Sequence, residues 1–252
     1  MKTILIASAT GGSAKTTTAV RLAESLKRAR VPAGVMDLSP YPTANYLVRE
    51  KDVFALNGRG AATSVAVDAM LRPLEDRCRA LVIDTGRLDD PMLDFWIEFC
   101  DAMILTTRVD AFALKAFEGI WDSLEQRRKD NPEMKFLGFL PVVVGPEEKK
   151  NVRQLQLAAS RFVLETAVPF DQQEILRAQS TCIEGLDPLP ADYGEASREA
   201  YDALAAHTIG QLGIEQLPQT EPERKKEVGL FTKLWRVASK SVRPKVSTQG
   251  GY

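Results

Sequence analysis

The stretch ATGGSAKTTT, residues 9–18, joins an apolar run at 4–7 to an amphipathic segment at 19–30. An apolar strand, a turn of small residues, a Lys-Thr pair and a helix make up a phosphate-binding loop, in which backbone N–H groups and a helix N-terminus face an anion. A lysine for the outer phosphates and a hydroxyl for Mg²⁺ complete such a loop. The sequence supplies these parts as Gly11, Gly12, Lys15 and Thr16.

Two alanines distinguish this loop from the G-x-x-x-x-G-K-[ST] pattern, since Ala9 and Ala14 occupy its two glycine positions. The alternative is a small-residue turn between a strand and a helix, in which a hydroxyl caps the helix and no ligand binds. The polar residues further along the chain favour phosphate binding.

Length and composition allow one sizeable α/β core with a tail. The chain has 252 residues, 44% of them apolar, and a net charge of −1. Residues 214–252 hold eight Lys/Arg and four Glu, so this segment carries +4 and the rest of the chain −5. That distribution argues against a uniformly basic nucleic-acid binder.

The three cysteines, Cys78, Cys100 and Cys182, lie far apart without metal-ligand spacing, and His207 is the single histidine. We expect free, buried thiols in a reducing compartment. No apolar run reaches about 18 residues, and no charged segment precedes a cleavable apolar one at the N-terminus. A cytoplasmic protein is therefore expected.

Apolar runs suited to buried strands recur along the chain, with helical patterns between most of them. They lie at residues 4–7, 33–36, 80–83, 102–105, 136–144 and 162–168. This alternation predicts an α/β fold with a doubly wound, mostly parallel sheet and helices on both faces. We also expect a short edge strand at 53–56 and a helix at 64–71 that Pro73 kinks or ends.

Ligands of such sheets bind at the carboxyl ends of the strands, so polar residues that follow the apolar runs are candidates. Asp37 and Asp84 each end such a run. An acid in this position beside a phosphate loop holds Mg²⁺ through water, and Gly86 would let the chain turn close to the γ-phosphate. The alternative is that Asp84 or Thr85 caps a helix.

Two later turns also follow strands. Residues 107–110, TRVD, resemble the T-K-x-D signature by which some GTPases read guanine, with arginine in place of lysine. We favour Asp110 as the N-cap of a helix at 111–129. The last turn would face a nucleotide base in this architecture through Pro169, Phe170 and Asp171.

Over residues 1–213 the chain resembles the ParA/MinD type of P-loop ATPase (SIMIBI class). FCDAMILTTRVDAFALKAF (99–117) resembles the family's strand and following helix, and ETAVPF (165–170) with CIEGLDP (182–188) resembles its adenine-side turn. Family members bind ATP and Mg²⁺, dimerise face to face and release on hydrolysis. They thereby position plasmids, chromosomes, division proteins or other cargo over nucleoid DNA or membrane.

The resemblance implies a role for each matched residue. Lys15 would hold the β- and γ-phosphates, Thr16 the Mg²⁺ and Thr17 the α-phosphate. Asp84 would anchor the metal through water, and Asp37 would support the same region. The rest of the loop would surround the phosphates with Thr10, Gly11, Gly12, Ser13 and Ala14.

Three residues depart from the family's pattern. Thr10 stands in place of its signature lysine, Ser39 in place of the acid that positions the attacking water, and Ala14 adds a methyl group. General-base assistance contributes about 10²–10⁴-fold, so a slow P-loop ATPase is expected. Lys149 or Lys150 could replace the missing lysine, unless both only begin a solvated helix.

The C-terminal segment divides into a polar linker at 214–228, a basic amphipathic helix at 229–243 and a disordered end at 244–252. Apolar and basic residues alternate along the helix as Phe231, Lys233, Leu234, Trp235, Arg236 and Lys240. Such a helix is typical of a membrane interface with anionic lipid. Docking on the body or on a partner subunit, and binding to DNA, are the alternatives.

Three functions stay open. The first is a nucleotide-switched homodimer that partitions plasmid DNA or positions another large cargo, with an adaptor or activator in a ParB- or MinE-like role and association with nucleoid or inner membrane. The second is a catalytically impaired nucleotide-binding scaffold in plasmid maintenance or transfer, or at the membrane. The third, a ligase of the dethiobiotin-synthetase type, needs a small-molecule pocket that the sequence does not locate.

Overall fold

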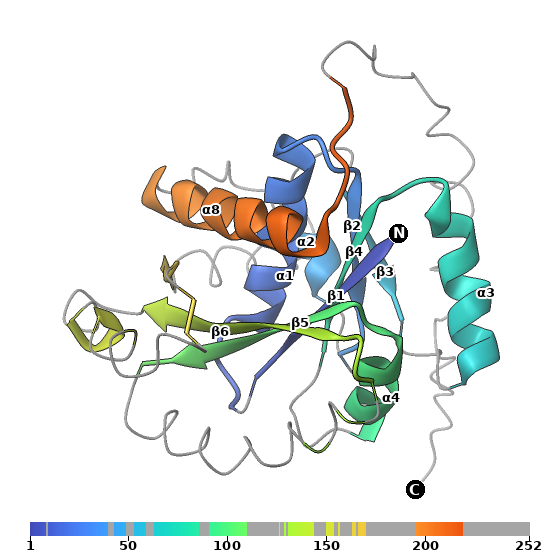
Figure 1. Cartoon of the computed structure of the whole chain (residues 1–252), viewed down its shortest axis with the longest axis horizontal. Helices are drawn as coiled ribbons and strands as arrows, with labels where there is room; N and C mark the ends of the chain where they lie inside the picture. Colours follow the sequence, from blue (N-terminus) through green and yellow to red (C-terminus); the bar gives the residue numbers. More distant parts are fainter. Residues whose placement is uncertain are drawn as a thin grey trace, which may run out of the picture. The chain divides into compact units, whose positions relative to one another are not determined.

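The computed structural model (Figure 1) divides into two compact units, Met1–Gln216 and Leu217–Tyr252. The residues that the structure describes are 1–8, 10–39, 43–48, 53–58, 63–85, 91–109, 126, 129, 131–143, 150–153, 156, 163–164, 166–169 and 195–218. The predicted helix at 229–243 and the end at 244–252 lie outside them.

Seven parallel strands of the described chain form one sheet, in the order β3-β2-β4-β1-β5-β6-β7. The predicted doubly wound parallel sheet is therefore confirmed. The strands are β1 (Lys2–Ala7), β2 (Ala33–Asp37), β3 (Phe54–Asn57), β4 (Ala80–Asp84), β5 (Ala102–Arg108), β6 (Lys135–Val143) and β7 (Val168–Pro169).

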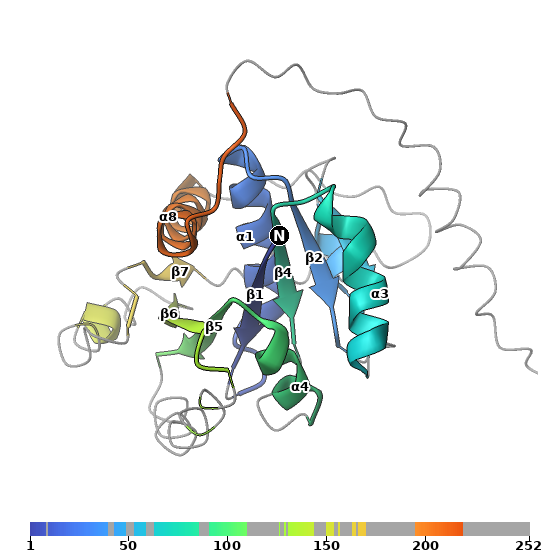
Figure 2. The same ribbon diagram turned by 45° about the vertical axis from the view of Figure 1, so that its right-hand side comes forward.

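Helices cover both faces of this sheet (Figures 1 and 2). Helices α1 (Lys15–Arg28), α2 (Ala44–Leu47) and α8 (Glu195–Leu212) pack on one face, and α3 (Ser64–Glu75) and α4 (Pro91–Phe99) on the other. Within β1, Ile4 and Ile6 face the first core, whereas Leu5 and Ala7 face the second. Burial on both faces explains why the strands are continuously apolar.

Three boundaries differ from the predictions. Helix α1 begins at Lys15, four residues early, and ends at Arg28. Helix α3 contains Pro73 and runs to Glu75, so the predicted end at residue 71 is wrong. Pro73 lies in the last turn, where its missing N–H leaves only one intrahelical hydrogen bond unmade.

The last strand is shorter than predicted. Of the predicted strand at 162–168, only Val168 belongs to β7, which consists of Val168–Pro169, and Val163 forms an isolated bridge to Phe139. Cys78 and Cys100 are free, buried thiols, as expected, whereas Cys182 lies outside the described residues. Among the described helices, none has the length and apolar character required to cross a membrane.

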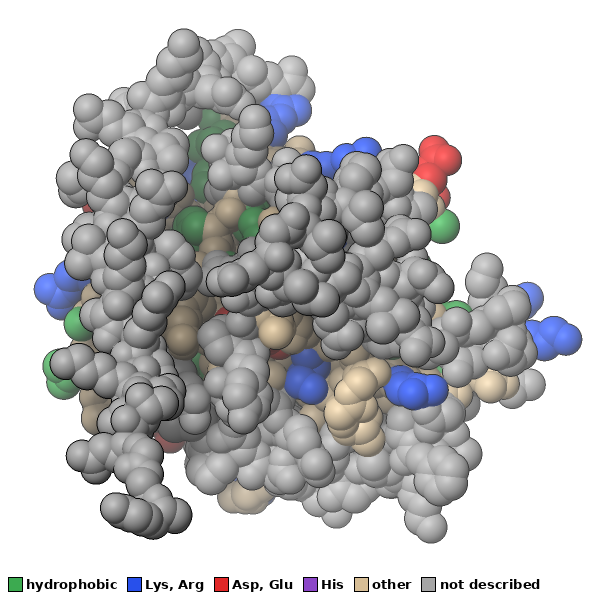
Figure 3. Space-filling view, turned by 180° about the vertical axis from the view of Figure 1, so that it is seen from behind, with side chains coloured by type: hydrophobic (Ala, Val, Ile, Leu, Met, Phe, Trp, Pro, Cys, Tyr) green, Lys and Arg blue, Asp and Glu red, His purple; other side chains and the backbone are tan. Residues whose placement is uncertain are grey.

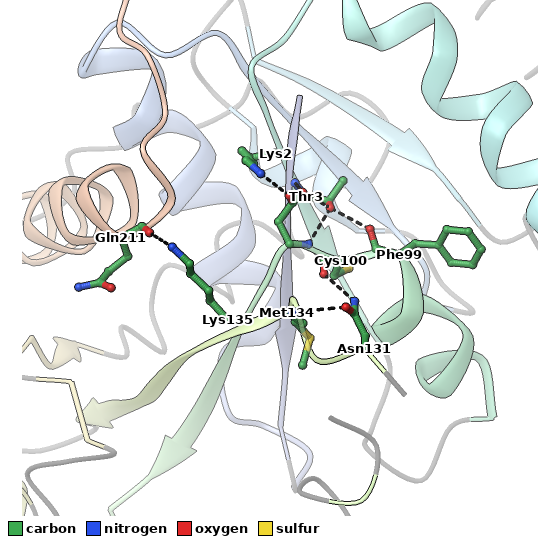
Figure 4. A network of polar contacts seen from close by, with 9 residues as sticks. Lys2, Thr3, Phe99, Cys100, Asn131, Met134, Lys135 and Gln211 are labelled. Carbon is green, nitrogen blue, oxygen red and sulfur yellow. Dashed lines mark hydrogen bonds and ion pairs between the residues drawn. The ribbon is translucent and has the colours of Figure 1, made fainter. Parts of the chain in front are cut away.

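A polar network fixes the amino ends of β1 and β5 (Figure 4). The Asp101 carboxylate accepts hydrogen bonds from the Thr3 amide at 2.8 Å and the Thr3 hydroxyl at 2.9 Å, and it pairs with Lys2. The Asn131 side-chain amide donates to three carbonyls at the end of α4, those of Ile97, Glu98 and Cys100. This network stabilises the end of the sheet opposite the carboxyl ends of the strands.

Candidate functional site

The loop between β1 and α1 passes through two left-handed backbone positions. Gly12 has φ +69°, and Ala14, the N-cap of α1, has φ 57° and ψ 30°. Glycine adopts this conformation without strain, but an alanine there costs about 1–2 kcal/mol. The loop thus keeps the bend that its pattern requires, although Ala14 replaces a glycine.

The start of α1 lacks a side-chain cap. Ala14 has no side chain that could accept a hydrogen bond from the first turn, so the alternative of a hydroxyl-capped turn is wrong. A β-carbon added at Gly11 or Gly12 would meet no heavy atom within 4 Å. The loop therefore borders open space at a helix N-terminus whose first N–H groups have no intrahelical acceptor, which suits an anion.

Buried hydroxyls lie behind the loop and contact its lysine. Lys15 Nζ donates to Ser8 Oγ at 3.1 Å, and Ser8 Oγ donates to the Thr10 carbonyl at 2.7 Å. Ser13 Oγ lies 2.6 Å from Ser8 Oγ and 3.0 Å from the Thr10 carbonyl. The hydroxyl of Thr106, on β5, donates to Ser13 Oγ at 3.3 Å. These contacts tie the loop to the sheet.

Asp84, at the end of β4, is a buried carboxylate without a hydrogen-bond partner on either oxygen among the described residues. The pKa of Asp84 is raised to about 7, mainly by burial and in smaller part by the Asp37 carboxylate, although the Thr16 hydroxyl and the Lys15 charge each lower it. The Thr16 hydroxyl is thus a close neighbour of this carboxylate. Such a carboxyl keeps its proton unless a cation beside it stabilises the charged form.

The arrangement around Asp84 fits a magnesium ion. Oxygen ligands from carboxylates and hydroxyls are those that Mg²⁺ prefers, and it binds proteins through one or two carboxylates together with phosphates. Asp84 supplies two oxygens that are not otherwise used, and Thr16 supplies a hydroxyl beside them. The described part of helix α4 begins at Pro91, and residues 86–90 lie outside the described residues, so the alternative that Asp84 or Thr85 caps a helix is not tested.

Asp37 has the opposite environment, although it is the partner of Asp84 across the neighbouring strands β2 and β4. Its carboxylate accepts four hydrogen bonds, from the Ser39 amide at 2.9 Å, the Ser39 hydroxyl at 2.6 Å, the Thr43 amide at 2.8 Å and the Ala44 amide at 3.0 Å. Asp37 therefore holds the turn that follows β2 and the start of α2.

The remaining predicted residues are only partly described. Thr10, Thr17 and Pro169 are half-buried, and Lys150 is exposed in a short helical segment. Several predicted residues lie outside the described part of the chain, namely Ala9, Gly86, Asp110, Lys149, Phe170, Asp171, Phe231, Lys233, Leu234, Trp235, Arg236 and Lys240.

Sequence reasoning missed Ser8 and Thr106. Both are hydroxyl residues at the carboxyl ends of apolar strands, where polar side chains are candidates for a site. Their connection through Ser13 depends on the pairing of β1 with β5, in which Ala7 lies opposite Leu105. The position of each residue at the end of a strand was thus visible in the sequence, but their connection through Ser13 was not.

Comparison with known proteins gives structural matches only. No protein-family model matches the sequence, and no curated protein does. McdA of Cyanothece without ligand superposes with a TM-score of 0.62 at 14% identity, over 82% of this chain and 99% of that one. MinD of Aquifex aeolicus gives a TM-score of 0.65 at 11% identity, over 86% of this chain and 99% of that one.

A biosynthetic enzyme matches as well. Cobyrinic acid a,c-diamide synthase of Mycobacterium smegmatis, bound to an ATP analogue and magnesium, gives a TM-score of 0.60 at 16% identity, over 88% of this chain and 100% of that one. Nucleotide is also present in an ATP complex of McdA and in MinD of Pyrococcus horikoshii with Mg-ADP. The chain therefore has the fold of the ParA/MinD-type P-loop ATPases.

Proposed function

We propose that this chain binds ATP with Mg²⁺ and works as a nucleotide-switched protein of the ParA/MinD type that positions a large cargo. The observation that carries the proposal is the buried Asp84 carboxylate, whose two oxygens have no partner among the described residues, beside Lys15 and Thr16 at an uncapped helix N-terminus. A fold shared by positioning ATPases and a synthase does not decide the function, so the site must.

The residues of the site divide the work. The backbone of Gly11 and Gly12 would approach the phosphates, and the Lys15 ammonium would neutralise the outer ones. Thr16 and Asp84 would hold the metal, Asp84 through water. Bound Mg²⁺ would neutralise charge that develops on the phosphates during their transfer to water. Pro169, with Phe170 and Asp171, would border the base.

Hydrolysis should be slow in this chain. A water-activating base must accept a proton near neutral pH, and Ser39 has only a hydroxyl, which donates to Asp37 at 2.6 Å. Asp37 already accepts four hydrogen bonds, so taking a proton from water would disturb the turn that it holds. Long-lived ATP binding, rather than rapid turnover, is therefore the proposed working state.

The switch we propose is an ATP-dependent homodimer that an adaptor or activator protein releases. Thr10 cannot send an ammonium across the dimer, so Lys149 or Lys150 would supply that charge; the exposure of Lys150 supports this. The cargo would be plasmid DNA or a large protein assembly, and the protein would be cytoplasmic, with association with nucleoid or inner membrane.

The C-terminal sequence offers a candidate attachment segment. On the face shown in Figure 3, the described Lys and Arg side chains are spread out instead of gathered in one patch. The amphipathic sequence at 229–243, with Phe231 and Trp235 among its apolar residues, is the segment we propose to bind anionic membrane, or else DNA.

The test combines calorimetry with size-exclusion chromatography and light scattering. Wild type should bind ATP·Mg²⁺ and convert to a dimer, whereas Lys15→Ala should do neither. Lys129→Ala, a change at a lysine outside the site, is the matched control. The absence of heat with either ATP·Mg²⁺ or GTP·Mg²⁺ would refute nucleotide binding, and binding without dimerisation would refute the switch.

The occupied Asp37 carboxylate favours a second candidate, a nucleotide-binding scaffold without catalysis in plasmid maintenance or transfer, or at the membrane. Steady-state phosphate release with and without a cognate activator separates the two candidates. Turnover that the activator stimulates supports the switch, and turnover no higher than that of Lys15→Ala supports the scaffold.

A further inference from the structure

The loop lysine of this chain has an acceptor behind the loop. Lys15 Nζ donates to Ser8 Oγ at 3.1 Å, and Ser8 is fully buried at the carboxyl end of β1. The same oxygen lies 2.6 Å from Ser13 Oγ and donates its own proton to the Thr10 carbonyl at 2.7 Å. A serine hydroxyl has one proton and two lone pairs, so these contacts use all of its capacity.

Ser8 therefore competes with phosphate for the ammonium group. A hydrogen bond from a charged donor is about twice as strong as one between neutral groups. The ammonium has three donors, so the competition arises where a triphosphate draws Lys15 Nζ away from Ser8; the bond is then broken and one lone pair of a buried oxygen is left unused. The free energy of that exchange makes the free energy of nucleotide binding less favourable.

We propose that Ser8 is a resting acceptor of Lys15, so that it helps to position the lysine in the ligand-free chain and lowers nucleotide affinity. This inference rests on the proposed function, since it presumes that Lys15 binds phosphate. Ser8 acts through Lys15 and has no contact with ligand of its own.

The structure separates this role from support of the loop. Ser13 Oγ lies within 3.0 Å of the Thr10 carbonyl, which Ser8 also bonds. When Ser8 loses its hydroxyl, Ser13 can donate to that carbonyl and keep the loop anchored. Ser8→Ala therefore removes the acceptor of Lys15 and leaves the loop in place. Ser13→Ala keeps both the contact between Lys15 and Ser8 and the bond from Ser8 to the Thr10 carbonyl, so it serves as the control.

Calorimetry with ATP·Mg²⁺ tests the proposal on wild type, Ser8→Ala and Ser13→Ala of the full chain. Ser8→Ala should bind about fivefold to tenfold more tightly, near the lower end of what a hydrogen bond to a charged group contributes. Ser13→Ala should bind no more tightly than wild type. Ser8→Cys, whose thiol is a weak acceptor, is the second variant and should shift the affinity in the same direction by less.

A second measurement needs no nucleotide. The Lys15 amine of the ligand-free chain should react faster with acetic anhydride in Ser8→Ala than in wild type, as read by peptide mass spectrometry, while Lys129 serves as the internal reference. Equal or weaker ATP binding by Ser8→Ala, or tighter binding by both alanine variants, would overturn the proposal. So would an unchanged Lys15 reactivity.

Failure of the proposed function gives a different result. Wild type would then show no heat with ATP·Mg²⁺, and the competition that we propose would fall with it. Wild type that binds, together with a Ser8→Ala variant that binds less tightly, leaves the proposed function standing and refutes only the role of Ser8.

Discussion

Replacing Asp84 by Asn should make the ligand-free protein more stable above neutral pH. Burial raises the pKa of Asp84 to about 7 from its ordinary value of 3.8. Between these two values the folded chain keeps a proton that the unfolded chain has released. The free energy of unfolding of the wild type therefore falls as pH rises from about 4 to about 7, and it is level above that.

The magnitude follows from the shift. Each pKa unit corresponds to about 1.36 kcal/mol, so a shift of roughly three units costs the wild type about 4 kcal/mol at pH 8. A buried amide that lacks partners also loses its hydration, at a cost of about 1–3 kcal/mol. Asp84→Asn should therefore be more stable at pH 8 by about 2 kcal/mol, with a profile that is level between pH 5 and 8.

Urea unfolding at pH 5, 6, 7 and 8 with a metal chelator measures both profiles. Asp101→Asn is the matched control, because it should have the opposite sign. Burial alone would raise the pKa of Asp101, but hydrogen bonds from Lys2 and Thr3 outweigh it and hold the pKa below its usual range. That carboxylate stabilises the fold above the unfolded pKa and loses this effect as pH falls, so Asp101→Asn should destabilise at pH 7.

Two results would refute the reasoning. One is an Asp84→Asn variant that is less stable than the wild type at pH 8, and the other is a wild type whose stability does not fall between pH 5 and 7. Either result would mean that the Asp84 carboxylate has a satisfying partner in the ligand-free protein. The strongest support for a cation beside Thr16 would then be gone.

Three further changes test the loop, the sheet and the opposite end of the fold. Ala14→Gly removes left-handed strain at the N-cap and should raise stability by about 1 kcal/mol, measured by thermal unfolding. Gly34→Ala places a β-carbon 2.4 Å from the Phe54 ring; it should cost about 1–3 kcal/mol, and the cost should disappear in a Phe54→Ala background if the clash is the cause. Asn131→Ala removes the amide that bonds three carbonyls of α4 and should cost about 1–3 kcal/mol, with faster hydrogen exchange confined to α4 and β5.

Sequence was sufficient where one residue and its neighbours decide the structure. Strands buried on both faces must be apolar throughout, so β1, β2, β4 and β5 were predictable from their runs. Asp84 was predictable because an acid that ends such a strand reaches the edge where ligands bind.

Contacts between distant segments were not predictable in the same way. The Thr106 hydroxyl reaches Ser13 across 93 positions of sequence, and only the register of β1 against β5 brings them together. Among the described residues, β7 pairs with β6 only at Val168 and Pro169, although the apolar run begins several residues earlier. Helix α3 continues through Pro73 because the missing donor falls in its last turn.

The two aspartates at the carboxyl edge of the sheet have different roles, although they are residues of the same type. Asp37 and Asp84 are neighbours in register, and the Asp37 carboxylate disfavours ionisation of Asp84. Four donors satisfy Asp37, whereas Asp84 has none among the described residues. A cation bound at this edge is therefore stabilised most beside Asp84, whereas Asp37 mainly stabilises the turn after β2. Removal of Asp37 should consequently disorder the turn after β2, whereas removal of Asp84 should abolish metal binding and leave the fold intact.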